Sequence, residues 1–289
     1  MIFMIQKSLI DPTSSYHDHE FYSVFFGEPF MFGDFIYYFD GKSARIIGYD
    51  KHGNAISESQ LGELLKTINL RYKAGSVWLE CPSPLKHFRI SGVYKRATVH
   101  RPIHNYDYEI IIQKEGYNYD ILCKNKKKYS NKGLQIQVSQ VSLTYKHMLM
   151  IERYLKRWRS KTFYKSEYVS SIFFLANRET SSLLSCYYEN RLMGFSIISS
   201  VKKLGMLNIH VTLNEKSGIS DLLYAEAIET LFKGSIDYIS LGFSMNQGLF
   251  NFKNKWGGIK HWKGGYEILW YKNSRVPSYL WTTRVIRNL

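Results

Sequence analysis

Two groups of histidine and acidic residues have the composition of a metal site. The first is the run His17-Asp18-His19-Glu20, and the second is the pair His100 and His104. Ligands two positions apart on a strand or loop need a third ligand from elsewhere in the chain. Pro102 lies between the second pair and argues against the helix that would put both rings on one face. We therefore assign no metal.

A serine follows a glycine in Gly242-Phe243-Ser244-Met245-Asn246, which begins like the nucleophile turn of a serine hydrolase. The closing glycine of that turn is missing, and the sequence shows no Cys-His or Ser-His-Asp arrangement. This fits direct transfer, in which an acceptor amine attacks a bound ester and the protein supplies positioning and charge stabilisation. The general base could be Glu226, Glu229, Asp237 or a substrate hydroxyl, and the sequence does not rank them.

The elements that position these residues follow a mixed α/β order. The first hundred residues predict a hairpin at 35–39 and 44–49 with a turn at 40–42, a helix that begins with a capping box of Ser57 and Gln60, and a strand at 76–80. From residue 107 the pattern predicts strand, helix, strand, two helices, three strands, helix, strand, helix and strand, at 108–112, 117–131, 134–138, 143–158, 166–176, 183–189, 192–200, 206–213, 220–233, 236–241, 248–256 and 266–271. This order favours a mixed sheet with helices on both faces. We expect two domains, 1–105 and 106–289.

Positive charge is abundant and clustered. The 289 residues include 39 Lys and Arg against 24 Asp and Glu, a net charge of +15. One cluster is Lys124, Lys126, Lys127 and Lys128, and others lie at 153–161 and 253–263. Such clusters favour a polyanionic partner through phosphate contacts. RNA, a nucleotide-linked substrate, an anionic membrane surface or an ordinary basic bias would each satisfy the composition.

The apolar residues, 45% of the chain, suffice for ordinary packed cores. No run approaches the roughly 18 apolar residues that a membrane-spanning helix needs. The first ten residues are too short for a signal peptide and are interrupted by Gln6 and Lys7. We expect a cytoplasmic protein without a membrane span.

The run from Asp237 to Gly258 has the most specific spacing in the chain. A short apolar strand stops at Gly242, a loop follows, and a basic amphipathic segment ends on Trp256-Gly257-Gly258. The paired glycines should let the chain turn and approach its neighbours closely. This order resembles the last part of the acyltransferase fold of the Fem family, peptidyltransferases that take an amino acid from aminoacyl-tRNA and join it to an amine. Weaker matches lie in the basic helix 124–132, the strand pair 187–195 and the helix 222–228.

The resemblance covers about residues 106–265 and implies the GNAT acyltransferase fold, whose element order the second domain also follows. The first domain looks like a shortened second copy, which would make the protein a tandem. Phe252 and Lys253 match the Phe-Lys pair that in Fem-type transferases lies near the 3′ end of aminoacyl-tRNA. There an ammonium can neutralise a terminal phosphate while an aromatic face supports a base or ribose. The alternative is a core Phe252 with a solvated Lys253 beside it.

We expect further site residues as well. Residues that would line the acceptor site are Tyr187, Tyr188, Tyr224, Ser244 and Asn246, and residues that would bind tRNA are Lys124, Lys126, Lys127, Lys128 and Lys255. Tyr266 is a further candidate for the acceptor channel, and in a chain with 23 tyrosines a core role is the competing interpretation of all four. We expect Lys253→Ala to lower transfer and leave the fold intact, because a lysine that faces a phosphate contributes little to folding.

Use of acyl-CoA can be judged from the loop Glu215-Lys216-Ser217-Gly218-Ile219-Ser220, which lies where a pyrophosphate-binding loop would be expected. GNAT enzymes hold its pyrophosphate on backbone N–H groups at a helix start, usually with Q/R-x-x-G-x-G/A. Only Gly218 fits, because Glu215 would repel the anion and Ser220 replaces the second glycine. We therefore expect aminoacyl-tRNA as co-substrate, no separate cofactor, and a small-molecule or peptide amine as acceptor. The alternatives are an N-acyltransferase that uses acyl-CoA or an acyl carrier, and a noncatalytic tRNA-binding module.

Overall fold

The protein folds into two compact units, residues 1–108 with 262–289, and residues 109–261. The computed structural model describes residues 23, 26–48, 56–72, 76–81, 94–100, 109–157, 165–201, 203–213, 218–244, 246–261 and 264–270. The candidate metal ligands at 17–20 and His104, and the start of the 215–220 loop, lie outside the described residues.

The first unit is a six-stranded sheet against which helix α2 packs. Its elements in chain order are β1 (Glu28–Phe32), β2 (Phe35–Phe39), β3 (Ser43–Ile47), α2 (Glu58–Tyr72), β4 (Ser76–Cys81), β5 (Tyr94–His100) and β13 (Gly264–Trp270). The spatial order is β1-β2-β3-β4-β13-β5. The first three strands are antiparallel, and β4 returns parallel to β3 after the helix.

Local sequence signals explain the start of this unit. The predicted hairpin is confirmed, and the Asp40 carboxylate closes its turn by accepting hydrogen bonds from the N–H groups of Lys42 and Ser43 at 2.8 and 2.7 Å. The predicted capping box of α2 is also confirmed. Ser57 N–H donates to the Gln60 side chain at 3.0 Å, and Gln60 N–H donates to Ser57 Oγ at 3.3 Å.

The last described strand, β13, lies in the first sheet. It pairs with β4 on one side and with β5 on the other, both antiparallel. From the sequence we expected this strand in the second domain, at 106–289, and its pairing with β4 and β5 corrects that expectation. The chain therefore completes the first unit only after it has built the second.

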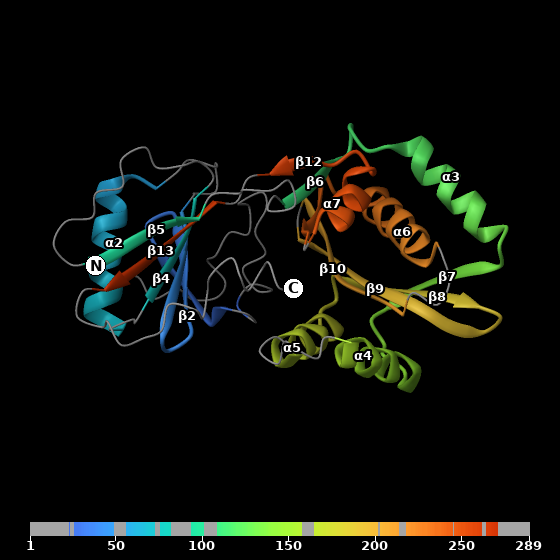
Figure 1. Ribbon diagram of the computed structural model, residues 1–289, viewed down its shortest axis with the longest axis horizontal. Coiled ribbons are helices and arrows are strands. Elements are labelled where there is room, and N and C mark those ends of the chain that lie inside the picture. The colour runs from blue at the N-terminus through green and yellow to red at the C-terminus, as the bar shows by residue number, and fades with distance from the viewer. Residues whose placement is uncertain are drawn as a thin grey trace. The chain divides into compact units, whose positions relative to one another are not determined.

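The second unit is a seven-stranded sheet between two layers of helices, as Figure 1 shows. Its elements are β6 (Glu109–Gln113), α3 (Tyr119–Ser130), β7 (Leu134–Gln140), α4 (Tyr145–Arg157), α5 (Lys165–Ala176), β8 (Ser181–Tyr188), β9 (Arg191–Val201), β10 (Leu204–Thr212), α6 (Ile219–Lys233), β11 (Tyr238–Phe243), α7 (Gln247–Asn254) and β12 (Ile259–His261). The spatial order is β12-β6-β11-β10-β9-β8-β7. Helices α3, α6 and α7 cover one face, and α4 and α5 cover the other.

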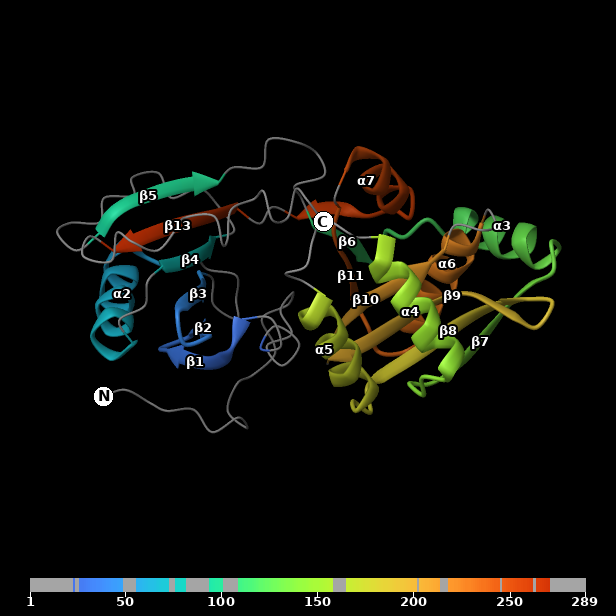
Figure 2. The same cartoon turned by 60° about the horizontal axis from the view of Figure 1, so that its bottom comes forward.

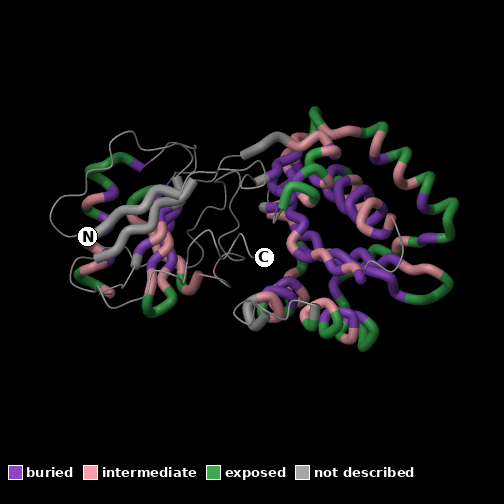
Figure 3. Tube along the Cα trace, in the orientation of Figure 1, coloured by how far each residue is buried: buried purple, intermediate pink, exposed green. Residues whose placement is uncertain are grey.

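The core of the second unit lies between the middle strands and α6. Strand β9 is buried from Leu192 to Ser199. Figure 2 shows this strand in the middle of the sheet from another side, and Figure 3 colours the buried residues purple. Gly194 and Gly205 let α6 approach the strands, because an added Cβ would lie 2.8 Å from Ile219 and 3.1 Å from Leu231 respectively. Among the described helices, none has the length and apolar character needed to cross a membrane.

Candidate active site

The parallel strands β10 and β11 separate after a short shared ladder. They pair at Leu204–Tyr238, Gly205–Ile239 and Met206–Ser240, whereas β10 continues to Thr212 and β11 to Phe243. Just beyond this ladder, the pairing of β10 with β9 shifts register between residues 207 and 209. The pairing of β11 with β6 shifts register between residues 240 and 243. Because bulges bend a strand and increase its twist, these two irregularities account for the divergence. An opening between two strands is where a parallel sheet can hold a ligand.

Five residues from β10, α6, α7 and the turn after α7 form a contiguous group at this opening. We call it the splay cluster: His210, Tyr224, Phe252, Lys253 and Trp256. The Tyr224 ring lies at its centre, with ring centroids 5.0 Å from His210, 4.8 Å from Phe252 and 6.4 Å from Trp256. Lys253 Nζ donates to the carbonyl of Gly242 in β11 at 3.3 Å. Helix α7 therefore carries an ammonium group to the point where β11 leaves its neighbour.

Lys253 is buried, with 5% of its surface exposed, whereas Phe252 is half-buried. This reverses the alternative in which Phe252 is the core residue and Lys253 is solvated. It also corrects our expectation that Lys253→Ala has no effect on folding. The alanine variant would leave a cavity and would remove the donor that the Gly242 carbonyl uses.

His210 is held in its neutral form. Its Nδ1 lies 2.8 Å from Ser196 Oγ and its Nε2 lies 3.0 Å from Ser220 Oγ. Burial, and then the positive charge of Lys253, lower the pKa of His210 to about 3. A neutral imidazole donates from one nitrogen and accepts at the other, so the two serines fix its orientation.

Tyr224 is fully enclosed and stays protonated. Burial raises the pKa of its phenol above the ordinary value, and Tyr154 adds to the rise. Tyr154 belongs to α4, on the face of the sheet opposite α6 (Figure 1). Tyr154 therefore raises the pKa of Tyr224 from the opposite face of the sheet.

Two buried polar atoms, one in the splay cluster and one just after β11, have no hydrogen-bond partner among the described residues. They are Ser244 Oγ, just after β11, and the indole Nε1 of Trp256, just after α7. Ser244 is 2% exposed and Trp256 is 1% exposed. Buried polar groups in native proteins are nearly always paired. These atoms are therefore the ones that a bound ligand or water would satisfy.

The paired glycines fix the end of this segment. Gly257 has a φ of +88°, and an added Cβ there would lie 2.4 Å from the carbonyl oxygen of Gly116. An added Cβ at Gly258 would lie 2.2 Å from Ile110 of β6. The predicted turn and close approach are confirmed, and they hold Trp256 against the sheet edge.

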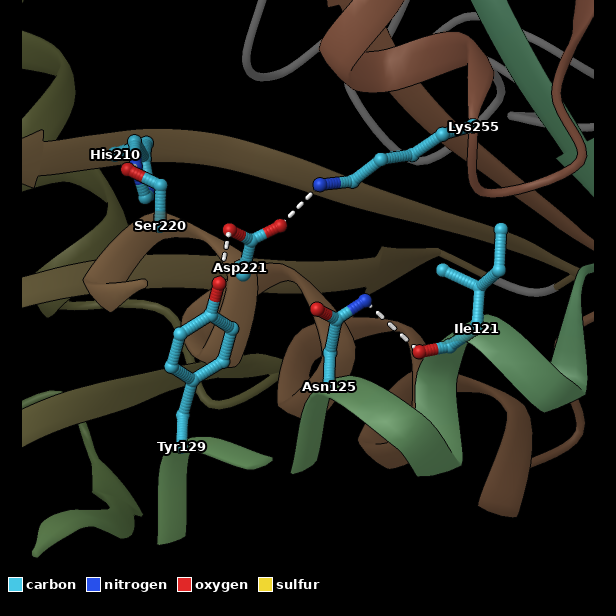
Figure 4. A network of polar contacts seen from close by, with 7 residues as sticks. All are labelled: Ile121, Asn125, Tyr129, His210, Ser220, Asp221 and Lys255. Atoms are coloured by element: carbon cyan, nitrogen blue, oxygen red, sulfur yellow. Dashed lines mark hydrogen bonds and ion pairs between the residues drawn. The ribbon is translucent and has the colours of Figure 1, made fainter. Parts of the chain in front are cut away.

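The start of α6 is covered by groups of the chain itself, as Figure 4 shows. Tyr129 Oη donates to the Asp221 carboxylate at 3.2 Å, and Lys255 forms an ion pair with the same carboxylate from the other side. Gly218 precedes the helix with a φ of +93°, and an added Cβ would lie 2.0 Å from the Tyr129 ring. Gly218 is the N-cap residue of α6, and since it has no side chain it forms no capping hydrogen bond. The helix start thus carries an acidic group in its first turn and an aromatic ring over its glycine.

The structure gathers only some of the predicted site residues. Tyr224, Phe252 and Lys253 belong to the splay cluster, and Ser244 follows two residues after Gly242, whose carbonyl accepts from Lys253. Asn246 caps α7, where its side chain accepts from Leu249 N–H at 2.9 Å. The predicted acceptor residues Tyr187 and Tyr188 lie in β8, which β9 separates from β10.

The predicted tRNA-binding lysines fall into two groups. Lys124, Lys127 and Lys128 are exposed on α3. Lys126 instead binds Glu226 at 2.8 Å and also binds Glu229. Burial alone would lower the pKa of Lys126, but the two carboxylates outweigh it and raise this pKa above the usual value. Lys255 lies over the Phe252 ring at 4.2 Å and binds Asp221. Lys126 and Lys255 are therefore part of the folded architecture.

The three candidate carboxylate bases are all engaged with lysines. Lys126 binds both Glu226 and Glu229, and it lowers the pKa of Glu229. Asp237 lies 3.3 Å from Lys203. His210, which no sequence pattern singled out, lies in the splay cluster with a lowered pKa. Its position in a buried strand carried no local signal of function.

No protein-family model matches this sequence, and no curated protein matches it. Solved structures do match. The C-terminal domain of a chain assigned as a lysylphosphatidylglycerol synthetase from Agrobacterium fabrum has a TM-score of 0.55 at 13% identity, over 84% of both chains. FemX has a TM-score of 0.54 at 9% identity, over 81% of this chain and 83% of that chain. A GCN5-related N-acetyltransferase from Kribbella flavida has 0.51 at 10% identity, over 84% and 89%. The protein therefore has the GNAT acyltransferase fold, as the sequence predicted.

Proposed function

We propose that this protein is an acyltransferase that moves an amino acid from aminoacyl-tRNA to an amine of a small molecule or peptide. The observation that carries the proposal is the buried ammonium of Lys253 at the opening between β10 and β11. The buried hydroxyl of Ser244, two residues after Gly242 in the chain, has no hydrogen-bond partner among the described residues. A preorganised cation in a site that excludes water stabilises developing negative charge far more than it would in solution. Such a group suits attack on an ester.

The chemistry needs few groups from the protein. The acceptor nitrogen attacks the ester carbonyl carbon of the aminoacyl group, and negative charge develops on the carbonyl oxygen. The C–O bond to the ribose then breaks, an amide bond forms, and the proton that the amine loses ends on the ribose hydroxyl. Lys253 Nζ would stabilise the oxyanion, and the half-buried Phe252 ring would support the terminal base or ribose.

Two of the similar structures support the choice of an amino acid as the transferred group. One carries the name FemX, of the family that the sequence run 237–258 resembles. The other is named for lysylphosphatidylglycerol, a product that contains lysine. Both share the fold of this chain, and the exposed lysines of α3 offer a surface for a polyanionic donor.

The start of α6 favours this donor over acyl-CoA. A pyrophosphate would have to approach backbone N–H groups next to the Asp221 carboxylate, and Tyr129 already lies against Gly218. The positive charge of Lys255 is used by Asp221. These contacts leave the helix start less suited to a pyrophosphate than one with two open glycines.

The test is transfer of labelled amino acids from a pool of charged tRNA to a pool of primary amines. We expect a labelled product that resists mild alkali, as an amide does and an ester does not, and that disappears when the tRNA is digested with ribonuclease beforehand. Label transfer that survives ribonuclease would refute the proposal. Transfer from an acyl-CoA alone would point to the alternative donor, and binding of tRNA without turnover on any amine would indicate a noncatalytic module.

A further inference from the structure

A second site lies in the same unit, at the hairpin between β8 and β9. It is a cavity of about 330 Å³ between α4 and this hairpin, closed at one side by Leu213 just after β10. This volume lies at the lower end of the range for small-molecule sites. None of the residues that line it belongs to the splay cluster.

The cavity has an apolar floor. Leu149 and Met150 of α4 meet Leu192 at the start of β9 and Leu213 beyond β10. Met150, Leu192 and Leu213 are buried, and Leu149 is half-buried. A ligand that fills this floor must carry an apolar portion, because burial of a polar group there would cost hydrogen bonds to water.

The rim of the cavity is cationic. Lys146 and Arg153 stand on α4 at the spacing i and i+7, on the face that also carries the floor residues of that helix. Arg191 faces them from the hairpin, and Glu189 is the carboxylate among the lining residues. Three positive groups against one negative group give the rim a net positive charge. The matching ligand group is a phosphate or a carboxylate.

The hairpin turn presents this rim through an unusual backbone. Glu189 and Asn190 both have positive φ, 48° and 60°, between the paired residues Tyr188 and Arg191. Two-residue turns of this kind match the twist of a hairpin, but glutamate at such a φ is uncommon. The turn sets both residues and Arg191 along one edge of the cavity.

We propose that this cavity binds an anionic amphiphile, a small molecule with a phosphate or carboxylate group and a short apolar chain. The cationic rim holds the anionic group, and the leucine and methionine floor holds the chain. This site does not depend on the proposed transfer reaction, and its occupation can be measured without tRNA. The same chemistry could come from a soluble metabolite or from the headgroup region of a lipid.

Calorimetry with three probes tests the proposal on the whole protein. We expect hexyl phosphate to bind at least tenfold tighter than inorganic phosphate or hexanol, because it alone satisfies both rim and floor. The double variant Arg153→Gln/Arg191→Gln should weaken hexyl phosphate at least tenfold. Lys156→Gln is the matched control, since Lys156 is exposed on the same helix, pairs with Glu152 and does not line the cavity.

Vesicles that contain phosphatidic acid distinguish the two sources of the ligand. Sedimentation that the double variant abolishes indicates a lipid, and hexyl phosphate binding without sedimentation indicates a soluble molecule. Equal affinity for hexyl phosphate and inorganic phosphate would overturn the proposal. Unchanged affinity for hexyl phosphate in the folded double variant would also overturn the proposal. So would a double variant that loses affinity for tRNA while the wild-type protein binds no hexyl phosphate.

Discussion

Replacement of Lys253 by methionine separates the charge of this side chain from its packing. Methionine keeps an unbranched stem of similar length and removes the ammonium that donates to the Gly242 carbonyl at 3.3 Å. A hydrogen bond from a charged group contributes about 1.5–3 kcal/mol. The buried ammonium, however, also loses its hydration, which offsets much of that gain. We therefore expect Lys253→Met to change the free energy of unfolding by less than about 1.5 kcal/mol.

The effect on catalysis should be much larger. Loss of one preorganised group that stabilises an oxyanion lowers kcat by roughly 100- to 1000-fold, or about 2.7–4 kcal/mol. The assay is single-turnover transfer from charged tRNA, with chemical denaturation of the same samples to measure stability. Lys233→Met is the control, because Lys233 is exposed at the end of α6.

An independent readout comes from His210. The charge of Lys253 contributes to the lowered pKa of His210, so Lys253→Met should raise that pKa in an NMR titration. Wild-type turnover in a folded Lys253→Met protein would refute the catalytic role. An unchanged His210 pKa would show that the two side chains do not interact as the structure indicates.

Three further outcomes follow from the structure. First, replacement of the exposed lysines of α3 (Lys124, Lys127 and Lys128) by glutamine should reduce the slope of log K against log salt for tRNA by about 2 to 3. The control Lys203→Gln should leave the slope unchanged, and equal slopes in both variants would contradict the RNA-binding assignment. Second, Gly218→Ala should destabilise the protein by more than about 1 kcal/mol, because the φ of +93° and the Tyr129 ring both oppose a Cβ. In a Tyr129→Ala background that loss should be smaller, and equal losses in denaturation curves would count against the contact. Third, the folded state disfavours the protonated form of His210, whose pKa is about 3. An unfolded histidine has a pKa of about 6.5, so the free energy of unfolding should fall as the pH drops from about 6.5 to 3, by about 1.4 kcal/mol per pH unit from this group. His210→Gln should fall less steeply over that range, and identical slopes would show that His210 titrates normally.

The features that could be predicted from the sequence are those that local signals determine. The capping box at Ser57 and Gln60 and the turn at Asp40 depend on residues near in sequence, and both are confirmed. The close approach at Gly257 is also confirmed, and there the signal was the glycine pair itself, because the atoms it approaches belong to the distant segment 116–118. The GNAT fold followed from the order of the elements, which the solved structures support. Local chemistry and element order were therefore sufficient for the fold class.

Features that depend on distant contacts could not be predicted in the same way. The apolar pattern of β13 is that of any strand, and only its pairing with β4 and β5 assigns it to the first sheet. The pattern of α7 indicates a buried Phe252, but the buried residues of this helix are Phe250 and Lys253, which lie three positions apart on one face. The Lys253 ammonium binds the Gly242 carbonyl of β11. His210 becomes a site candidate only because Ser196, Ser220 and Tyr224 from other elements meet it.

The most direct test of the central claim is a complex structure with a stable donor analogue, an adenosine that carries an amino acid through a 3′-amide. We predict that the analogue lies in the opening between β10 and β11, with its carbonyl oxygen within hydrogen-bonding distance of Lys253 Nζ and a polar group on Ser244 Oγ. An analogue bound away from these two side chains, or an acyl-CoA that occupies the opening in its place, would contradict the account.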